Sequence, residues 1–470
     1  MASPFTDIVV LLPGIMGSEL SQHGKPVWAA KAGAAIEAVR TFGGSIRQLT
    51  LPPGVGDAAP DPNGPGGGVV ATGLFPDIHV IPGLWTAHLG YGLLEKWLQN
   101  RFELTRVTAD GPPGNYLPFA YDWRLSVRYN GELLARQLDD VVDRWRELQG
   151  PYAEAKVTFI AHSMGGLVAR WAIAHGGLAS RTRRLVTLAT PHRGSMLAVD
   201  KLCNGVRAGW GPLQINLDDF ARSLPGLHHL LPAYACMLGG ESLRTVDQVE
   251  LPSLKTTRVR DAMTFYAELD EPGASPDWDF IPYVGMQQLT STTGLVVGPK
   301  VTFVDLIDDL DEGGDGTVPR LSATPSWLSP SDPIVHYVTD KHGAVQSNQT
   351  VIDDLEAILT ARDVPHRGPT VIGQTLLDVR VPDVVEVGAE LPIQVVIREG
   401  PPAALRAVLL RDDVQVVERQ PLAPDGTAFR AAFGPQPEGL YSVRVESTLP
   451  GSGVVPTVTS PFAVWGAGAP

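Results

Sequence analysis

The sequence predicts an α/β fold followed by a small all-β module. A chain of 470 residues is long enough for two or three domains. Residues 1–360 mix short β-branched runs with amphipathic helical patterns, which is typical of an α/β fold. Over residues 371–470 the helical pattern disappears, and about seven short segments alternate apolar and polar residues. We therefore expect an α/β domain and an immunoglobulin-like β-sandwich, joined by the polar, proline-containing linker 361–370.

The composition is that of a globular protein, with 44% hydrophobic and 19% charged residues. The net charge of −14 repels a phosphate backbone, so nucleic-acid binding is not expected. Every apolar run of about 18 residues is broken by a charge or a proline, and the N-terminus lacks the basic region of a signal peptide. These features predict a cytoplasmic protein. For the two cysteines, Cys203 and Cys236, unpaired buried thiols are favoured over a single disulfide.

The first predicted element is a buried strand over residues 8–12 (IVVLL), which runs into a turn at Pro13-Gly14. A glycine-rich turn at the carboxyl end of a strand can direct backbone N–H groups at a developing negative charge. This turn is therefore a candidate part of an oxyanion hole.

The strongest local pattern is VTFIAHSMGGLVAR, residues 157–170. It predicts a buried strand, then Ser163 on a sharp turn, then a helix that begins at Met164. Such a turn strains the serine backbone and tolerates only small flanking residues, here Ala161, Gly165 and Gly166. The pattern indicates a nucleophile elbow of the form A-x-S-x-G. The amide of Met164, the residue after the serine, is the second candidate donor to an oxyanion.

Residues 196–295 are irregular, with short helical segments between two predicted strands. We expect an inserted cap over this interval.

Two later segments offer the partners that an activated serine needs. VTFVDLI, residues 301–307, predicts a strand, and Asp315 lies between two glycines in the acidic loop that follows it. His342 follows another predicted strand and is the favoured base, whereas the competing His336 lies inside the strand pattern. The neighbouring acidic residues predict a solvated loop rather than a metal site: Asp305, Asp308, Asp309 and Asp311.

Taken together, these segments resemble the lecithin:cholesterol acyltransferase-like branch of the α/β-hydrolases, which includes lysosomal phospholipase A2 and many bacterial lipase-like proteins. The matching stretches occur in the order of that family and cover roughly residues 8–360. They are LLPGIMGSEL, PFAYDWRL, FIAHSMGGLVAR, LATPHRGS, GDGTVP and KHGAV. The resemblance implies an α/β-hydrolase fold with a cap, a triad of Ser163, Asp315 and His342, and an oxyanion hole formed by the amides of Ile15 and Met164.

Other prominent residues have structural interpretations beside functional ones. Residues 121–124 (YDWR) are expected to brace the site as a buried polar cluster rather than to contact substrate, and His162 is expected to point away from Ser163. His192 lies either at a pocket mouth or in a structural hydrogen bond. Trp85 lines an acyl-chain pocket or takes part in ordinary packing. The same two interpretations apply to the apolar cap residues Leu224, Leu227, Leu230 and Leu231.

The leading hypothesis is a serine-dependent hydrolase or acyltransferase that cleaves a hydrophobic acyl ester, with a lipid or phospholipid as partner. An amidase or peptidase with the same triad, and a non-catalytic binding or scaffold protein, stay open as alternatives. No cofactor and no metal are expected, since His228 and His229 lack the spacing of metal ligands. Peripheral membrane contact and the partner of the β-module are left open.

Overall fold

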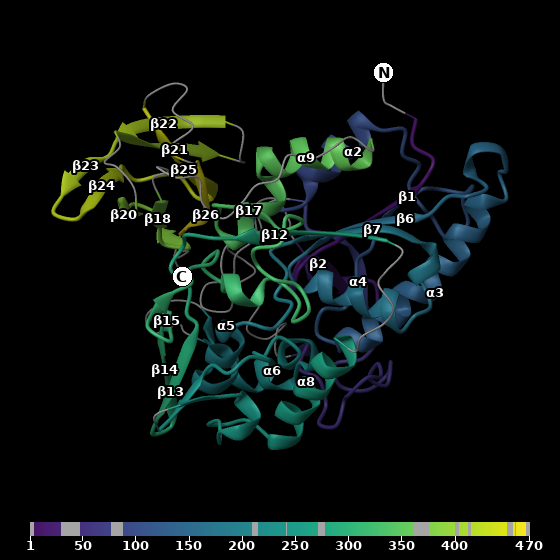
Figure 1. Ribbon diagram of the computed structural model, residues 1–470, viewed down its shortest axis with the longest axis horizontal. Coiled ribbons are helices and arrows are strands. Elements are labelled where there is room, and N and C mark those ends of the chain that lie inside the picture. Colours follow the sequence, from purple (N-terminus) through teal and green to yellow (C-terminus); the bar gives the residue numbers. More distant parts are fainter. Residues whose placement is uncertain are drawn as a thin grey trace.

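The computed structural model describes residues 4–29, 48–76, 88–208, 215–240, 242–270, 278–360, 376–399, 404–411, 415–448, 455 and 457–466. At its centre lies a six-stranded sheet in the order β17-β12-β7-β6-β1-β5, with every pairing parallel (Figure 1). Its strands, in chain order, are β1 (Ile8–Leu12), β5 (Tyr116–Pro118), β6 (Val157–His162), β7 (Thr182–Leu188), β12 (Asp279–Gly285) and β17 (His336–Val338).

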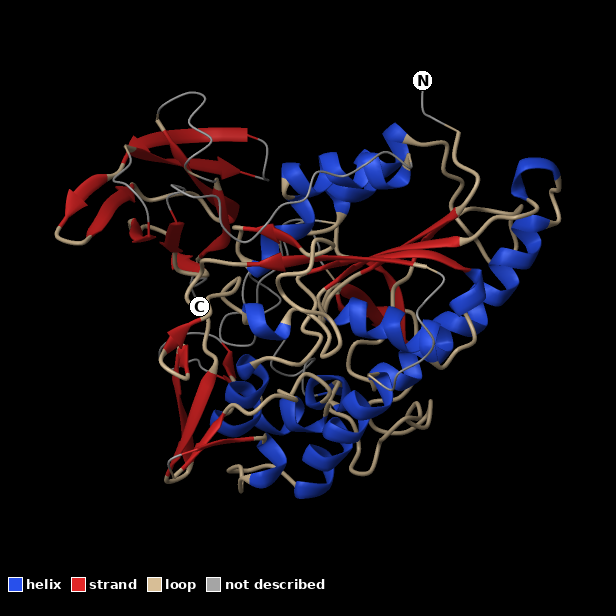
Figure 2. Cartoon of the chain, in the orientation of Figure 1, coloured by secondary structure: helices blue, strands red, loops and turns tan. Residues whose placement is uncertain are grey.

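Helices cover both faces of this sheet (Figure 2). Ile8, Val10 and Leu12 of β1 pack in one apolar cluster with residues of α3, α4 and α8, and Val9 and Leu11 pack in a second cluster with residues of α2 and α9. Strand β1 is therefore buried on both faces, as its uninterrupted apolar run predicts. The helices are α2 (Gly92–Arg101), α3 (Val127–Arg146), α4 (Met164–Ala174), α8 (Thr256–Leu269) and α9 (Gln349–Leu359). Among the described residues, no helix combines the length and apolarity that crossing a bilayer requires.

This parallel sheet with helices on both faces is the predicted α/β-hydrolase arrangement. Short elements connect its parts. They are β2 (Ser18–Gln22), β3 (Lys25–Trp28), β4 (Val69–Leu74), η1 (Gly150–Tyr152), η2 (Ala179–Arg181), η6 (Arg320–Ser322) and η7 (His342–Ser347).

The segment predicted as a cap forms short helices and small sheets outside the central sheet. Its elements outside the central sheet are α5 (Met196–Val199), η3 (Asp200–Asn204), β8 (Arg207–Ala208), β9 (Ile215–Asn216), α6 (Asp218–Ser223), α7 (Pro225–His228), β10 (Met237–Gly239), β11 (Ser242–Arg244) and η5 (Val246–Gln248). At the end of the interval and beyond it follow β13 (Thr293–Val297), β14 (Lys300–Val304), β15 (Leu306–Ile307) and β16 (Leu310–Asp311). The interval 196–295 needs correction at its end, because it contains β12, which pairs with β7 in the central sheet.

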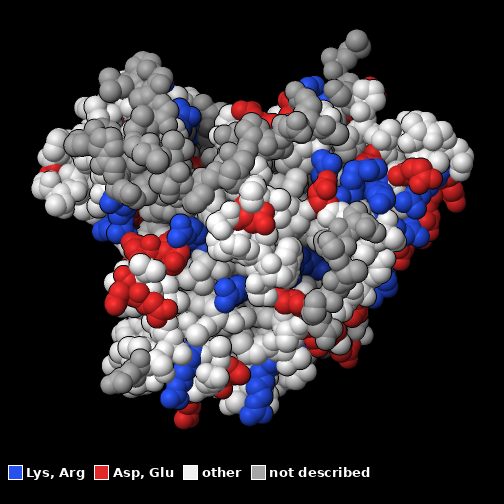
Figure 3. All heavy atoms as spheres, viewed as in Figure 1, with Lys and Arg blue, Asp and Glu red and all other residues white. Residues whose placement is uncertain are grey.

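The strand predicted over residues 301–307 is also corrected. Strand β14 pairs antiparallel with β13 in a separate four-stranded sheet, and Leu306–Ile307 pair with Leu310–Asp311 in a hairpin. Figure 3 shows acidic side chains gathered over this part of the surface. The region before Asp315 is thus an outlying antiparallel segment and adds no strand to the central sheet.

At the C-terminal end, two sheets face each other across an apolar core of their own. One contains β18 (Leu376–Arg380), β20 (Leu391–Glu399), β23 (Ala423–Asp425) and β24 (Ala428–Phe433). The other contains β19 (Val384–Glu386), β21 (Leu405–Arg411), β22 (Gln415–Pro421), β25 (Gly439–Ser447) and β26 (Val458–Trp465). The alternation of apolar and polar residues predicts this β-rich module, because strands such as β20, β21 and β25 turn one face to the shared core.

Both cysteines are buried free thiols, as predicted. Burial raises the pKa of Cys203 and of Cys236 to about 12, so both stay protonated at neutral pH.

Candidate active site

Ser163 lies between strand β6 and helix α4 with φ 52° and ψ −128°, a conformation that L-residues rarely adopt. The turn leaves no room for larger neighbours, since a Cβ on Gly165 would lie 2.5 Å from the carbonyl oxygen of Pro13. The Ser163 amide donates to the carbonyl of Leu188 on β7 at 2.9 Å, which anchors the turn to the sheet. The backbone is thus that of the predicted elbow.

The three residues that the sequence predicts as a triad lie in direct contact. The Nε2 atom of His342 lies 2.9 Å from Ser163 Oγ, and its Nδ1 atom lies 2.8 Å from Asp315 Oδ2. Because a carboxylate only accepts, Nδ1–H donates to Asp315 and Nε2 accepts from the serine hydroxyl. All three side chains are at least 97% buried, so water does not screen the relay.

Asp315 is held by its own loop. Its second oxygen, Oδ1, accepts from the amides of Thr317 at 2.9 Å and Val318 at 2.7 Å. The amide of His342 donates to the Asp315 carbonyl at 2.9 Å, which couples the backbones of the acid and base loops. The carboxylate therefore has a fixed orientation toward the imidazole.

The competing candidates have other roles. His336 is buried in β17 and stacks on Tyr283, with ring centroids 5.0 Å apart. Among the neighbouring acids, Asp305 accepts from Ser291 and Asp311 pairs with Arg398 at 3.1 Å, while Asp308 and Asp309 adopt positive φ in the β15–β16 turn. In the described part of the chain, no group of three His, Cys, Asp or Glu side chains could hold a metal ion.

The turn after β1 lies against the elbow. A Cβ on Gly14 would lie 2.9 Å from the Cβ of Ser163, so only glycine permits this approach. The Gly14 amide already donates to the Tyr91 hydroxyl at 2.8 Å. Ile15, the residue after Gly14, and Met164, the residue after Ser163 at the start of α4, are both buried. Their amides stay the predicted oxyanion donors.

A second hydrogen-bond chain runs behind the triad and includes a residue that the sequence did not reveal. The Tyr91 hydroxyl lies 2.8 Å from His162 Nδ1, and His162 Nε2 lies 3.1 Å from the carbonyl oxygen of His342. Since that carbonyl only accepts, His162 Nε2–H donates to it, Tyr91 O–H donates to Nδ1, and Gly14 N–H donates to Tyr91. Burial raises the pKa of Tyr91 well above its usual value, so this hydroxyl keeps its proton. The structural role predicted for His162 therefore extends to the base loop.

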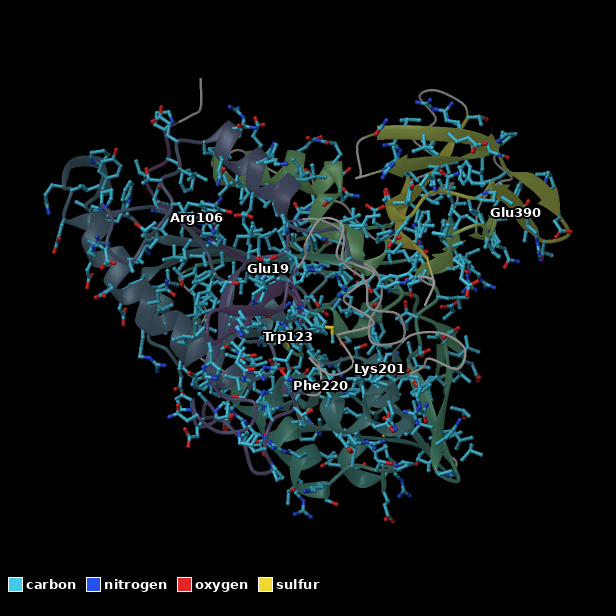
Figure 4. All side chains as sticks on the ribbon, turned by 180° about the vertical axis from the view of Figure 1, so that it is seen from behind. Glu19, Arg106, Trp123, Lys201, Phe220 and Glu390 are labelled. Atoms are coloured by element: carbon cyan, nitrogen blue, oxygen red, sulfur yellow. The ribbon has the colours of Figure 1, made fainter. Side chains whose placement is uncertain are left out.

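The YDWR motif forms the expected buried polar cluster. Arg124 donates from Nε to Asp122 Oδ1 at 2.9 Å and from Nη2 to Oδ2 at 2.7 Å. The Tyr121 hydroxyl donates to the Pro13 carbonyl at 2.8 Å, which braces the turn beside Ser163. Trp123 packs edge to face with Phe220, with ring centroids 6.4 Å apart (Figure 4). The cluster positions the turn from behind.

The two predicted pocket residues have different outcomes. His192 is fully buried, and its ring nitrogens lie 3.4 Å from Arg170 Nη1 and 3.2 Å from Thr187 Oγ1. Its burial and these two contacts favour the structural hydrogen-bonding interpretation. Trp85 lies outside the described residues.

Residues 81–224 match the family described as PGAP1-like alpha/beta domain, a stretch that contains Ser163 but neither Asp315 nor His342. The chain is 32% identical over 90 residues to the Saccharomyces cerevisiae protein named Uncharacterized protein YJR098C. This aligned stretch covers 19% of this chain and 12% of the yeast protein. Among solved structures it is similar to the Bacillus licheniformis lipase BlEst2. The mature form has 13% identity and a TM-score of 0.36 and covers 76% of this chain and 94% of that one. The propeptide form has 11% identity and a TM-score of 0.35, and the alignment covers 98% of this chain and 94% of that one. The parallel six-stranded sheet with helices on both faces is that of an α/β-hydrolase fold, and residues 81–224, which contain the elbow, are similar to PGAP1-like α/β domains.

Proposed function

We propose that this protein is a serine-dependent ester hydrolase or acyltransferase that forms an acyl-enzyme. The observation that carries the proposal is the buried hydrogen-bond relay from Ser163 Oγ through His342 to Asp315, with the serine on a strained elbow. A binding or scaffold protein needs none of these three groups in contact. Strained backbone that persists at such a turn is typical of a functional site.

The proposed reaction has two steps, acylation of Ser163 and deacylation, and each step uses the same three side chains. Ser163 Oγ attacks the ester carbonyl carbon while His342 Nε2 takes the hydroxyl proton, and Asp315 stabilises the imidazolium. The tetrahedral oxyanion accepts from the amides of Ile15 and Met164, where the N-terminus of α4 adds favourable electrostatics. The ester C–O bond then breaks, and the leaving alcohol takes the proton from His342. Water or an alcohol acceptor attacks the acyl-enzyme by the same route.

We propose a hydrophobic acyl ester, such as a lipid or phospholipid, as the substrate class. The resemblance to the lecithin:cholesterol acyltransferase-like branch supports this class, since its motifs span most of the α/β part of the sequence. Hydrolysis and acyl transfer use the same residues and differ only in the acceptor.

Probe labelling and ester cleavage test the proposal together. The purified protein is expected to react with a fluorophosphonate probe and to release p-nitrophenol from p-nitrophenyl acyl esters. Ser163→Ala is expected to lose labelling and to lower kcat by roughly 10⁴-fold or more. Ser331→Ala, at an exposed serine, is the matched control and is expected to behave like the wild type. Full labelling of Ser163→Ala would refute the assignment.

Substrate comparison separates the chemical alternatives. Acyl esters are expected to turn over far faster than peptide substrates at equal concentration, and the reverse order would indicate an amidase or peptidase. An added long-chain alcohol is expected to divert the acyl group into a new ester if the protein is a transferase.

A further inference from the structure

The three residues before His342 are bonded to the C-terminal β-module. The hydroxyl of Thr339 donates to the carbonyl of Thr457 at 2.8 Å, and the Lys341 amide donates to the carbonyl of Thr459 at 3.3 Å. Between them, the Asp340 carboxylate accepts from the Thr459 amide at 2.5 Å. The base loop thus runs along the start of β26, which lies beside β17 in Figure 1.

The other carboxylate oxygen of Asp340 accepts a hydrogen bond from the residue that caps helix α9. It accepts from Nδ2 of Asn348, whose Oδ1 accepts from the Val351 amide and caps α9. Asp340 is 98% buried, so both carboxylate oxygens depend on these partners in place of water. One side chain therefore fixes both ends of the segment that carries His342.

Gln288 connects the same module to both triad loops. Its Oε1 accepts from the Val379 amide on β18 at 3.1 Å, and its Nε2 donates to the carbonyls of Leu377 at 3.1 Å and Thr339 at 2.9 Å. Its own amide donates to Gly314 at 3.0 Å, directly before the triad acid. The side chain is fully buried, and all of its amide atoms are used.

These contacts lie at one edge of the central sheet. Strand β17 has only three residues, and within the described part of the chain its one partner strand is β12. The base must stay within about 0.5 Å of its productive position, and a displacement of about 1 Å can lower turnover about 100-fold. A loop that leaves a short edge strand needs a second surface to hold it.

We propose that Gln288 and Asp340 are positioning residues through which strands β18 and β26 hold the loops of His342 and Asp315 in register with Ser163. The β-module then takes part in the geometry of catalysis. This inference rests on the proposed ester-cleaving function.

Steady-state kinetics of full-length variants test the inference. Gln288→Met keeps the side-chain length but removes all three amide hydrogen bonds. It is expected to lower kcat for p-nitrophenyl esters about 10- to 100-fold and to change KM less than about threefold, because the loss lies in alignment rather than in substrate binding. Thr339→Val and Asp340→Asn disturb single contacts, and each is expected to lower kcat about two- to tenfold.

Val443→Ala is the matched control for stability. Val443 is fully buried in the core of the β-module on β25. Its truncation is expected to lower the melting temperature while kcat, measured well below that temperature, stays at the wild-type value. A merely structural role for Gln288 would make the two variants alike in kcat.

A folded Gln288→Met protein with wild-type kcat would overturn the inference, as would an equal loss of kcat in Val443→Ala. If Gln288→Met does not fold, Thr339→Val and Asp340→Asn decide by the same criterion. Absence of ester cleavage and of probe labelling in the wild type would refute the proposed function itself. Wild-type activity with unaffected variants would refute only the positioning role.

Discussion

Asp315 divides its two carboxylate oxygens between His342 and the amides of its own loop. Asp315→Asn is expected to fold normally, because an amide oxygen can still accept from Thr317 and Val318. Its amide nitrogen then faces Nδ1 of His342 and favours the wrong tautomer, so kcat is expected to fall about 10³- to 10⁴-fold. The measurement is steady-state ester cleavage beside a thermal melt. Asp305→Asn, at a carboxylate that accepts from Ser291, is the matched control, and equal losses in both variants would contradict the role of Asp315.

Tyr91 joins the turn at Gly14 to His162, which in turn supports the backbone of His342. Tyr91→Phe leaves a buried amide and a ring nitrogen without this partner, so we expect a loss of about 1–3 kcal/mol in the free energy of unfolding. We also expect kcat to fall about tenfold, because the oxyanion turn loses its anchor.

Tyr116→Phe provides the comparison, since its hydroxyl donates to Glu95 at 3.0 Å away from the triad. Denaturant unfolding and ester kinetics are measured on both variants. We expect both variants to lose stability and only Tyr91→Phe to lose kcat. An unchanged kcat in Tyr91→Phe would contradict the role of this hydrogen-bond chain.

Local sequence indicated the three side chains now in contact better than it indicated their surroundings. Ser163 and His342 follow strand patterns, Asp315 lies between two glycines, and the structure brings the three side chains within hydrogen-bond distance. Tyr91 carried no such pattern, because its contacts to Gly14 and His162 cross 77 and 71 residues of sequence. For His192, sequence left two interpretations that only burial and its two polar neighbours could separate.

At the scale of elements, helices α3 and α4 pack closely because Gly131 meets Trp171. A Cβ on Gly131 would lie 2.6 Å from Cδ1 and 2.8 Å from Cβ of the buried Trp171 side chain. Alanine gains about 1 kcal/mol of helix propensity over glycine, but overpacking a rigid ring costs about 1–3 kcal/mol. Gly131→Ala is therefore expected to destabilise the protein despite its better propensity.

Chemical denaturation of a double-mutant cycle checks this prediction. In the Trp171→Leu background, where the smaller side chain leaves room, Gly131→Ala is expected to cost less or to stabilise. A stabilising Gly131→Ala in the wild-type background would show that the two helices can separate without penalty.

Strands that are buried on both faces were predicted well. Strands whose place depends on which other strand they pair with were predicted poorly. The apolar run of β1 specifies a central strand, because helices cover both of its faces. Residues 301–307 have equally good strand character, yet β14 pairs with β13 outside the central sheet. The central strand β12 was hidden in the predicted cap, since alternation reveals a strand but not its neighbours.

At the scale of the whole molecule, several buried titratable groups have opposite effects on the free energy of unfolding as the pH is lowered. Burial lowers the pKa of His192 well below its usual value, lowers that of His228 to about 4 and lowers that of His229 despite Asp261. Burial raises the pKa of Asp340 to about 6. Because burial lowers these three pKa values, the folded state binds fewer protons at the three histidines than the unfolded chain does below about pH 6.5. Asp340 acts in the opposite direction between about pH 6 and pH 4.

Three groups outweigh one, so the free energy of unfolding is expected to fall as the pH is lowered from 6.5 to 4. The pKa shift of His228 corresponds to about 3 kcal/mol of this loss between pH 6.5 and pH 4, and the shift of Asp340 offsets about 3 kcal/mol. His192 and His229 add to the loss in the same direction. His228→Asn keeps a side-chain N–H in reach of the Leu224 carbonyl, which His228 Nδ1 contacts at 2.8 Å, but cannot titrate. It is expected to flatten the dependence of stability on pH, whereas Asp340→Asn is expected to steepen it. Urea unfolding at pH 7.5, 6 and 5 measures both slopes, and identical slopes in the wild type and His228→Asn would show that this histidine is protonated in the folded state.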